Sequence, residues 1–247
     1  QQLAPDEYLP SLMEWEFPSN VSSGLRLRVG SRDLVLRGKI DRVDLHADGK
    51  HYRIIDYKSG STEFDLTAVY YGMNLQLPIY LQAFVENNSM LEPGDLGYFY
   101  FRKPVYTSSK SLAVPDDANI LERVRREKWS SWADRSPDSL KIIGKYAAVK
   151  AATVAEEIFT GNVSAKPQCM NRDNVPCIWC EYKALCNYDD RISARRTLVL
   201  PDVELPSTYP GRETLKRSEV KAARNEFIEN LMTNYIEDHM QNMNHGE

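Results

Sequence analysis

The apolar and polar residues of two stretches of the chain predict a β-hairpin. Residues 38–45 (GKIDRVDL) and 51–58 (HYRIIDYK) are rich in the β-branched and aromatic residues that strands prefer. Between them, Asp48-Gly49 is a strong signal for a two-residue turn, because both residue types tolerate a positive φ. The pattern therefore predicts two antiparallel strands joined at this turn.

The register of this hairpin brings three charged side chains together. It places Asp41 directly opposite Asp56, with Lys58 on the same face two residues later. On the other face Asp44 lies opposite Arg53 as a cross-strand ion pair. Two opposed carboxylates destabilise a sheet by some tenths of a kcal/mol to about 1 kcal/mol. A hard cation such as Mg²⁺ or Mn²⁺ removes that repulsion and binds through carboxylates.

Two carboxylates and a lysine in this arrangement are suited to metal-assisted cleavage of a phosphodiester. A bound cation would lower the pKa of a coordinated water and offset the charge that develops on the phosphate. Lys58 would orient the water or stabilise the transition state as a point charge. From Asp41, Asp56 and Lys58 alone, a structural carboxylate pair beside a solvated lysine is an equally good interpretation.

The segment after the hairpin has apolar residues at helical spacing and predicts one helix over residues 66–86. Gln76 and Tyr80 are four residues apart and share one face of it. Pro78 removes one backbone hydrogen bond, so we expect a kink at that point. On their own, Gln76 and Tyr80 fit a core helix with a satisfied amide and a tyrosine at its rim.

Taken together, GKID, IDYKSG and the Q-x-x-x-Y spacing resemble the RecB-type branch of the PD-(D/E)xK nuclease superfamily, and most closely its AddB-type nuclease domains. The resemblance implies that Asp41 and Asp56 are metal ligands and that Lys58 is the catalytic lysine. It implies that Gln76 and Tyr80 help to hold the active site and the DNA strand. The implied fold is α/β, a mixed central sheet flanked by helices, with a cysteine cluster in the C-terminal segment.

The sequence departs from this family at one position. RecB-type nucleases usually carry an upstream histidine that reaches the metal, but here no histidine precedes Asp41, and the first is His46 near the predicted turn. Glu14 or Glu16, in LMEWEFP, would supply a further carboxylate. The alternative interpretation is that both are acidic residues of an exposed segment.

All four cysteines fall within eighteen residues, at the spacing C-x7-C-x2-C-x5-C: Cys169, Cys177, Cys180 and Cys186. In a bacterial cytosolic chain such clustering indicates metal ligands. The spacing allows a tetrahedral Zn²⁺, an iron–sulfur cluster or a disulfide-stapled loop. The resemblance implies a [4Fe–4S] cluster held by the last three cysteines, with either Cys169 or a residue outside the chain as fourth ligand.

Length and composition limit the domain organisation. At 247 residues and 42% hydrophobic content the chain can build one large core. We predict a nuclease domain over 1–190, a linker over 191–210 and an amphipathic helical tail over 211–247. No apolar run is long enough for a membrane span, and the start has neither signal-peptide features nor an initiating Met. A bacterial cytoplasmic protein that is part of a longer polypeptide is expected.

The net charge of −4, from 31 basic and 35 acidic residues, is not the overall signature of a nucleic-acid binder. Residues 101–150 are locally basic, and a helix predicted near 117–130 has charges that would meet phosphates or solvent. Strands near 24–30, 33–46 and 96–102 and a helix near 138–160 complete the predicted elements. No Walker A motif is found in the chain, so a helicase motor would have to lie elsewhere.

The preferred hypothesis is a Mg²⁺-dependent deoxyribonuclease module that cuts a single DNA strand supplied by a helicase, in double-strand-break resection. Its partners would be an A-type helicase–nuclease subunit and the rest of its own polypeptide. One alternative is a non-catalytic DNA-binding scaffold with the same fold and a structural metal. Another is a free-standing, CRISPR-associated (Cas4-like) exonuclease.

Overall fold

The computed structural model describes residues 7–17, 24–59, 65–100, 136–162, 164, 166–170, 175–186 and 197–245. Within them the main sheet has the strand order β1-β4-β5-β6. Its strands are β1 (Tyr8–Phe17), β4 (Gly38–His46), β5 (His51–Lys58) and β6 (Glu92–Tyr100). The β5–β6 pair is parallel and the other two pairs are antiparallel. The predicted mixed sheet is confirmed.

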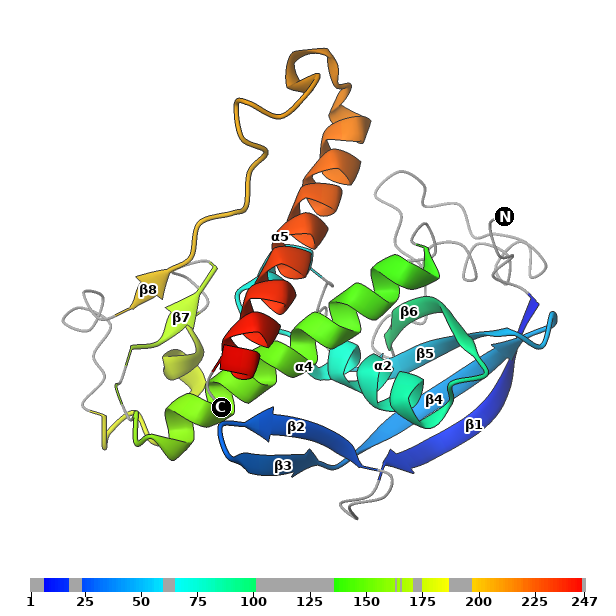
Figure 1. Ribbon diagram of the computed structural model, residues 1–247, viewed down its shortest axis with the longest axis horizontal. Helices are drawn as coiled ribbons and strands as arrows, with labels where there is room; N and C mark the ends of the chain where they lie inside the picture. The colour runs from blue at the N-terminus through cyan, green and yellow to red at the C-terminus, as the bar shows by residue number, and fades with distance from the viewer. Residues whose placement is uncertain are drawn as a thin grey trace.

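Helices cover one face of this sheet (Figure 1). They are α1 (Leu66–Tyr70), α2 (Gln76–Asn87), α4 (Pro137–Phe159) and α5 (Arg217–His245), with α5 crossing the outer side of α4. Beside α4 lies a separate hairpin of β2 (Leu25–Val29) and β3 (Arg32–Leu36). The C-terminal region adds the parallel pair β7 (Gln168–Cys169) and β8 (Leu198–Val199) and the short helices η3 (Pro176–Trp179) and η5 (Arg212–Thr214).

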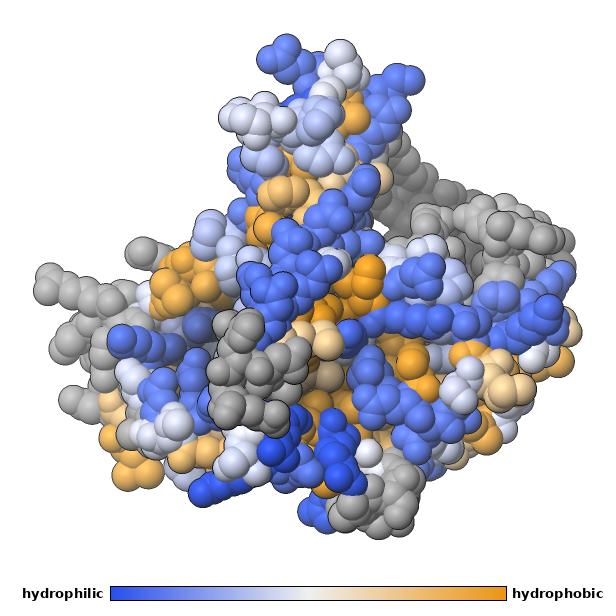
Figure 2. Space-filling view, viewed as in Figure 1, coloured by the Kyte–Doolittle hydropathy of each residue, from blue (hydrophilic) through white to orange (hydrophobic). Residues whose placement is uncertain are grey.

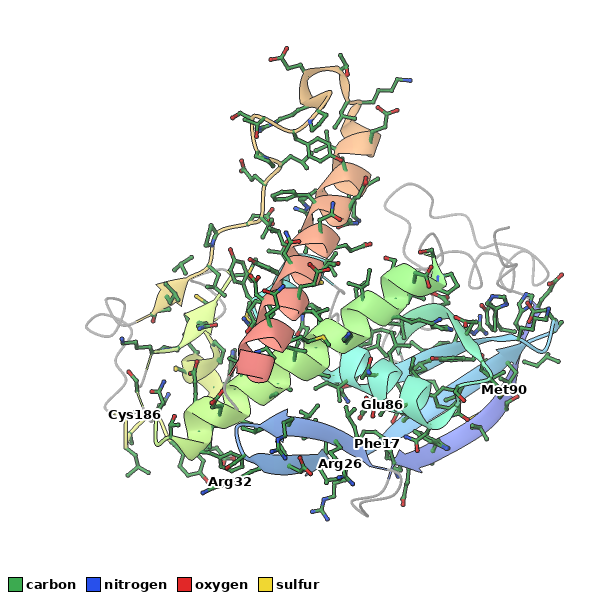
Figure 3. The ribbon with its side chains drawn as sticks, viewed as in Figure 1. Phe17, Arg26, Arg32, Glu86, Met90 and Cys186 are labelled. Atoms are coloured by element: carbon green, nitrogen blue, oxygen red, sulfur yellow. The ribbon has the colours of Figure 1, made fainter. Side chains whose placement is uncertain are left out.

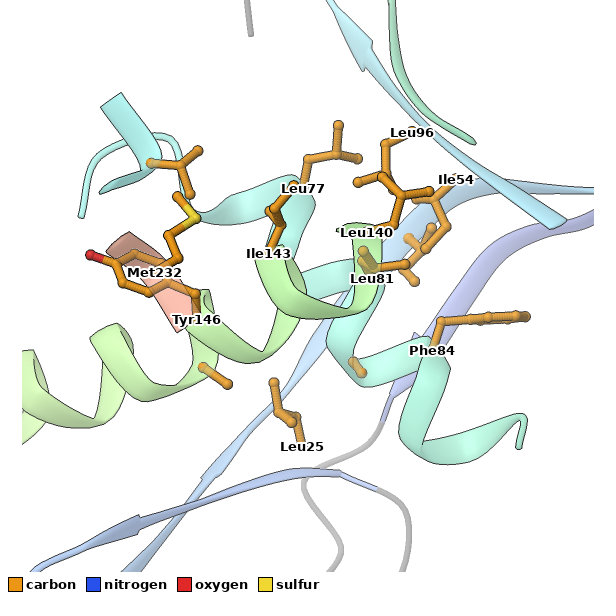
Figure 4. Close-up of a cluster of buried hydrophobic side chains, with 14 of the residues drawn as sticks. Leu25, Ile54, Leu77, Leu81, Phe84, Leu96, Leu140, Ile143, Tyr146 and Met232 are labelled. Atoms are coloured by element: carbon orange, nitrogen blue, oxygen red, sulfur yellow. The ribbon is translucent and has the colours of Figure 1, made fainter. Parts of the chain in front are cut away.

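The core lies between the sheet and the helices α2 and α4 (Figure 4). Ile54 of β5 and Leu81 of α2 are fully buried there, as is Leu140 of α4. Helix α4 approaches α2 closely because residue 144 is glycine: a Cβ at Gly144 would lie 3.1 Å from Gln82 Oε1. The packing of α4 against α2 is therefore tight, and it helps to fix the position of α2.

The hairpin register follows the prediction. Strands β4 and β5 pair Val43 with Ile54 and Asp44 with Arg53, and the ladder continues with one pair on each side. Gly49 of the turn has φ +68°, the left-handed conformation that favours glycine. The turn itself is longer than the predicted two residues: β4 ends at His46 and β5 begins at His51, so residues 47–50 connect the strands, and the Gly49 amide donates to the His46 carbonyl.

Three sequence-based boundaries need correction. The strand predicted over 33–46 is two strands, β3 and β4, which belong to different sheets. The single helix predicted over 66–86 is interrupted: α1 ends at Tyr70, and Gly72 and Asn74 have positive φ before α2 starts at Gln76. The strand β1, over residues 8–17, was not predicted at all, because its side chains are mostly exposed on both faces.

The helix predicted near 138–160 is confirmed as α4. The one predicted near 117–130 lies outside the described residues, with most of the basic segment 101–150 and the first part of the predicted linker. None of the helices in the described part of the chain combines the length and apolar character needed to cross a bilayer.

Helix α5 packs on the rest of the fold. Ile228, Met232 and Ile236 are spaced one turn apart and join the same core cluster as the sheet and α4. Other apolar residues of the predicted amphipathic tail, Val220 and Met240, are exposed. Polar residues cover most of the outward surface of α4 and α5 (Figure 2).

Met232 and Met240 offer a matched test of α5 docking. Met232 is fully buried and Met240 is 46% exposed. We expect Met232→Ala to lower the free energy of unfolding by about 2–5 kcal/mol, because it leaves a cavity, and Met240→Ala to change it little. Urea denaturation of both variants measures the difference; equal effects would show that α5 is not part of the core.

Candidate active site

The two predicted acidic residues lie at the end of the β4–β5 ladder. The ladder's last pair is Arg42 with Ile55, one step before Asp41 and Asp56. Instead of continuing it, the half-buried Asp41 side chain accepts a hydrogen bond from the amide of Tyr57, with Oδ2 2.8 Å from the nitrogen. This bond anchors Asp41 to β5, next to Asp56.

Asp56 is a buried carboxylate in contact with the Lys58 ammonium. The residue is 2% exposed, and no well-aligned hydrogen bond reaches Oδ2 from the described residues, although Lys58 Nζ lies 2.6 Å away. Burial raises the pKa of Asp56, and the charge of Asp41 adds to this, against the opposing effect of Lys58. The ionised form of the Asp56 carboxylate is thus less stable than it would be in water, and a further positive charge beside it would stabilise it.

Lys58 connects the sheet to α2. Its Nζ atom donates to Gln76 Oε1 at 2.7 Å while contacting Asp56, and it lies 5.4 Å from the centre of the Tyr98 ring. Gln76 Nε2 in turn donates to the Tyr80 hydroxyl at 3.0 Å. Four of the five predicted site residues are therefore linked by a continuous set of polar contacts, and Asp41 is bonded to the backbone of β5 one residue after Asp56.

Helix α2 begins at Gln76, one of the predicted site residues. Asn74 has φ +55° and ends the preceding turn, and Gln76 is the first helical residue. Pro78 is the third, where a backbone N–H would have no partner within the helix. Pro78 therefore permits the helix to start at this point and does not kink it, which corrects the sequence-based expectation. Tyr80 follows Gln76 one turn later on the same face.

An aromatic residue that the sequence analysis missed supports Tyr80. The ring of Phe17, at the end of β1 beneath α2 (Figure 3), packs edge-on against Tyr80 with centroids 6.0 Å apart. Gly38 makes room for it, since a Cβ at residue 38 would lie 2.4 Å from Phe17 Cζ. The alternation in EWEF, residues 14–17, was the signal that would have predicted this strand.

The other face of the hairpin carries a buried ion pair. Asp44 is fully buried and receives Arg53 at 2.7 Å and Arg42 at 2.6 Å, and the Arg53 guanidinium also lies over the Tyr8 ring. The predicted Asp44–Arg53 pair is thus present but, unlike an ordinary surface pair, is out of contact with solvent.

Neither Glu14 nor Glu16 joins the two aspartates in a compact metal-binding group within the described residues. Both are exposed. The Glu14 carboxylate pairs with Lys39, and Glu14 has φ +53°, an unusual conformation for a non-glycine residue. The histidine nearest in sequence, His46, lies at the far end of β4.

The four cysteines differ in their surroundings. Cys169 is buried in the β7–β8 pair, Cys177 and Cys180 are half-buried around η3, and Cys186 is exposed. All four are described, and no three of their sulfur atoms lie within 4.8 Å of one another. A tetrahedral Zn²⁺ holds its sulfurs about 3.8 Å apart, so the segment is not closed around a single ion.

A family model described as the PD-(D/E)XK nuclease superfamily matches residues 4–187, and the chain belongs to this superfamily. The fold class expected from the resemblance is thereby confirmed. Members of this superfamily use divalent metals, and the Asp41–Asp56 site suits one: it offers two adjacent carboxylates, one with an oxygen that lacks a well-aligned donor.

Among known proteins, the chain is similar to the B-type component of the ATP-dependent helicase/deoxyribonuclease of several bacteria. Identity is 30% with that of Clostridium tetani, covering 82% of this chain and 21% of the relative. It is 30% with that of Clostridium kluyveri (68% and 18%) and 28% with that of Alkaliphilus metalliredigens (64% and 17%). The resemblance to AddB-type proteins is confirmed. The chain spans about a fifth of the length of these curated relatives.

The contact between Gly38 and Phe17 can be tested by a double-mutant cycle. We expect Gly38→Ala to destabilise the fold by about 1–3 kcal/mol, because the new methyl group overpacks against the Phe17 ring. Phe17→Leu in the Gly38→Ala background should recover part of that loss, as measured by urea denaturation. Strictly additive effects of the two substitutions would contradict the contact.

Proposed function

We propose that this chain is the nuclease module of a helicase–nuclease that processes double-strand DNA breaks. The observation that carries the proposal is the continuous set of contacts from Asp56 through Lys58 and Gln76 to Tyr80, beside Asp41. Membership in a nuclease superfamily and similarity to B-type helicase/deoxyribonuclease proteins support it. The reaction is hydrolysis of a DNA phosphodiester, and the substrate is a single strand.

Asp41 and Asp56 would hold a Mg²⁺ or Mn²⁺ ion, which when bound supplies a polarised water and neutralises charge on the phosphate. Lys58 places its ammonium at the reacting phosphate, where negative charge develops in the transition state. Gln76 holds that ammonium in position through its carbonyl oxygen. The Tyr80 hydroxyl accepts from Gln76 Nε2, so its own proton can be donated to a phosphate of the strand.

The site lies where a strand of DNA can reach it. Gln76 is exposed, Tyr80 is half-buried, and the Lys58 side chain is 24% exposed. The carboxylate of Asp56 lies deeper, behind Lys58. This order of depth lets a phosphate contact Lys58, Gln76 and Tyr80 from the surface while the acidic pair faces it from below. The partners we propose are the A-type helicase–nuclease subunit and the remainder of the longer polypeptide.

Two substitutions test the mechanism on end-labelled single-stranded DNA with and without Mg²⁺. We expect Asp56→Asn to abolish metal-dependent cleavage and Lys58→Ala to reduce its rate by about 10²–10³-fold. Lys50→Ala, at an exposed lysine of the same hairpin, should leave the rate unchanged. Cleavage by Asp56→Asn at the wild-type rate would contradict the mechanism. Wild-type protein without Mg²⁺- or Mn²⁺-dependent nicking would favour a non-catalytic scaffold.

The same Asp56→Asn variant should be at least as stable as the wild type in the absence of metal. Because the pKa of Asp56 is raised, the folded state binds more protons than the unfolded state between the ordinary and the raised pKa. The metal-free fold therefore loses stability as pH rises through that range, and the neutral amide removes the loss. A lower melting temperature for Asp56→Asn at neutral pH would show that its carboxylate is structural.

For the cysteine segment we propose a [4Fe–4S] cluster held by Cys177, Cys180 and Cys186, with Cys169 as the fourth ligand. The spacing of the last three cysteines, C-x2-C-x5-C, and the resemblance to AddB-type nuclease domains support this proposal.

We expect anaerobically prepared protein to contain about four iron atoms per chain and to lose them in Cys180→Ala and in Cys169→Ala. Iron content and visible absorption measure this. Stoichiometric zinc without iron would refute the cluster, and full iron content in Cys169→Ala would assign the fourth ligand elsewhere.

A further inference from the structure

The turn between β4 and β5 carries a second group of possible metal ligands: His46, Asp48 and His51. One ligand atom from each residue lies within 4.8 Å of the others. The group is at the start of β5, and Lys58 is at its end, seven residues or roughly 20 Å away. It is therefore separate from the Asp41–Asp56 site.

The Asp48 carboxylate is oriented by the turn itself. Its Oδ1 atom accepts from the amides of Lys50 at 2.8 Å and His51 at 3.1 Å. This leaves Oδ2 directed at the two imidazoles, 2.6 Å from His51 Nδ1 and 3.2 Å from His46 Nδ1. The bond from the Lys50 amide, together with those from His51, holds the pKa of Asp48 well below its usual range. The carboxylate is therefore ionised and in place before any ligand binds.

The imidazole of His46 is directed at that carboxylate. The residue is 6% exposed, its Nδ1 atom lies 3.3 Å from the amide nitrogen of Asp48, and the same Nδ1 atom lies 3.2 Å from Asp48 Oδ2. A buried imidazole nitrogen and a carboxylate oxygen therefore face each other at the spacing of two ligands of one ion.

The other nitrogen of His46 provides a second indication. Nε2 is buried and has no hydrogen-bond partner of good geometry among the described residues, yet Glu7 Oε2 lies 3.1 Å from it. A carboxylate behind a histidine is the usual outer partner of a metal-ligating imidazole, since it orients the ring and raises its basicity. Glu7 is placed to do this for His46.

We propose that His46, Asp48 and His51 form a binding site for a single Zn²⁺ ion, with Glu7 supporting His46 from behind. A tetrahedral site with Zn–N and Zn–O distances near 2.0–2.1 Å has ligand atoms about 3.3 Å apart. His46 Nδ1 and Asp48 Oδ2 already have this spacing. The contact between His51 Nδ1 and Asp48 Oδ2, at 2.6 Å, is shorter than this spacing and would lengthen when an ion binds to both atoms. Two imidazoles favour Zn²⁺ over Mg²⁺, which prefers oxygen ligands.

The ion would connect the ends of three strands of the main sheet. His46 ends β4, His51 begins β5, and Glu7 precedes β1, with its carbonyl accepting from the Ala47 amide at 2.9 Å. A metal on these residues would add a further link between the three strand ends. Its role is structural, since it holds the hairpin whose opposite end carries Asp41 and Asp56.

Zinc content and melting temperature of the whole chain test the site without any nuclease assay. Wild type, His51→Gln, Asp48→Asn and the control His239→Gln are dialysed against Zn²⁺ in excess Mg²⁺, and bound zinc is measured by mass spectrometry. The cysteines and the Asp41–Asp56 pair are unchanged in all four proteins, so a difference between them reports the turn. Asn at 48 keeps an oxygen for the Lys50 and His51 amides, which preserves the turn.

We expect His51→Gln and Asp48→Asn each to bind about one Zn²⁺ ion fewer than wild type and His239→Gln. At a free Zn²⁺ concentration near one hundred times the dissociation constant, wild type should gain about 5–10 °C in melting temperature beyond either variant. Equal zinc content and equal melting shifts in all four proteins would overturn the proposal. Loss of the bound zinc to Mg²⁺ would also overturn it, by showing a nonselective acidic cluster.

Discussion

The buried ion pair between Asp44 and Arg53 holds the β4–β5 hairpin in one register, and the rest of the site depends on that register. Removing one partner of such a pair costs about 3–5 kcal/mol, because the other charge is left buried and unpaired. A slip of one residue would turn Asp44 toward the helices and Val43 away from them. The polar face and the apolar face of the hairpin therefore specify the same alignment.

That register also positions the residues of the proposed active site. Asp41 and Asp56 lie at the same end of the ladder. Lys58 follows Asp56 two residues later on β5. Lys58 then meets Gln76 because α2 packs on the sheet through fully buried residues such as Leu77 and Leu81. The acidic pair weakens the sheet locally, whereas the core beneath α2 and α4 supplies the packing that tolerates it.

The two ends of one hairpin offer different chemistry to metal ions. The end with Asp41 and Asp56 presents carboxylates, which suit a hard cation and a phosphate substrate. The turn presents His46 and His51 with Asp48, a set that suits a borderline ion such as Zn²⁺. Ligand type thus distinguishes the proposed reactive site from the proposed structural one, although both lie on the same pair of strands.

The sequence by itself determined the hairpin and its register, and it predicted the five residues of the proposed site, because strand propensity and two-residue periodicity are local properties. The sequence also predicted helix α4. The end of α1, the start of α2 and the place of β1 were decided by the tertiary structure. The Pro78 ring is compatible with a kink inside a helix or with the first turn of a new helix, and tertiary packing decides between the two. Phe17 and Tyr98 became site neighbours through strand pairing between distant segments, which no local pattern encodes.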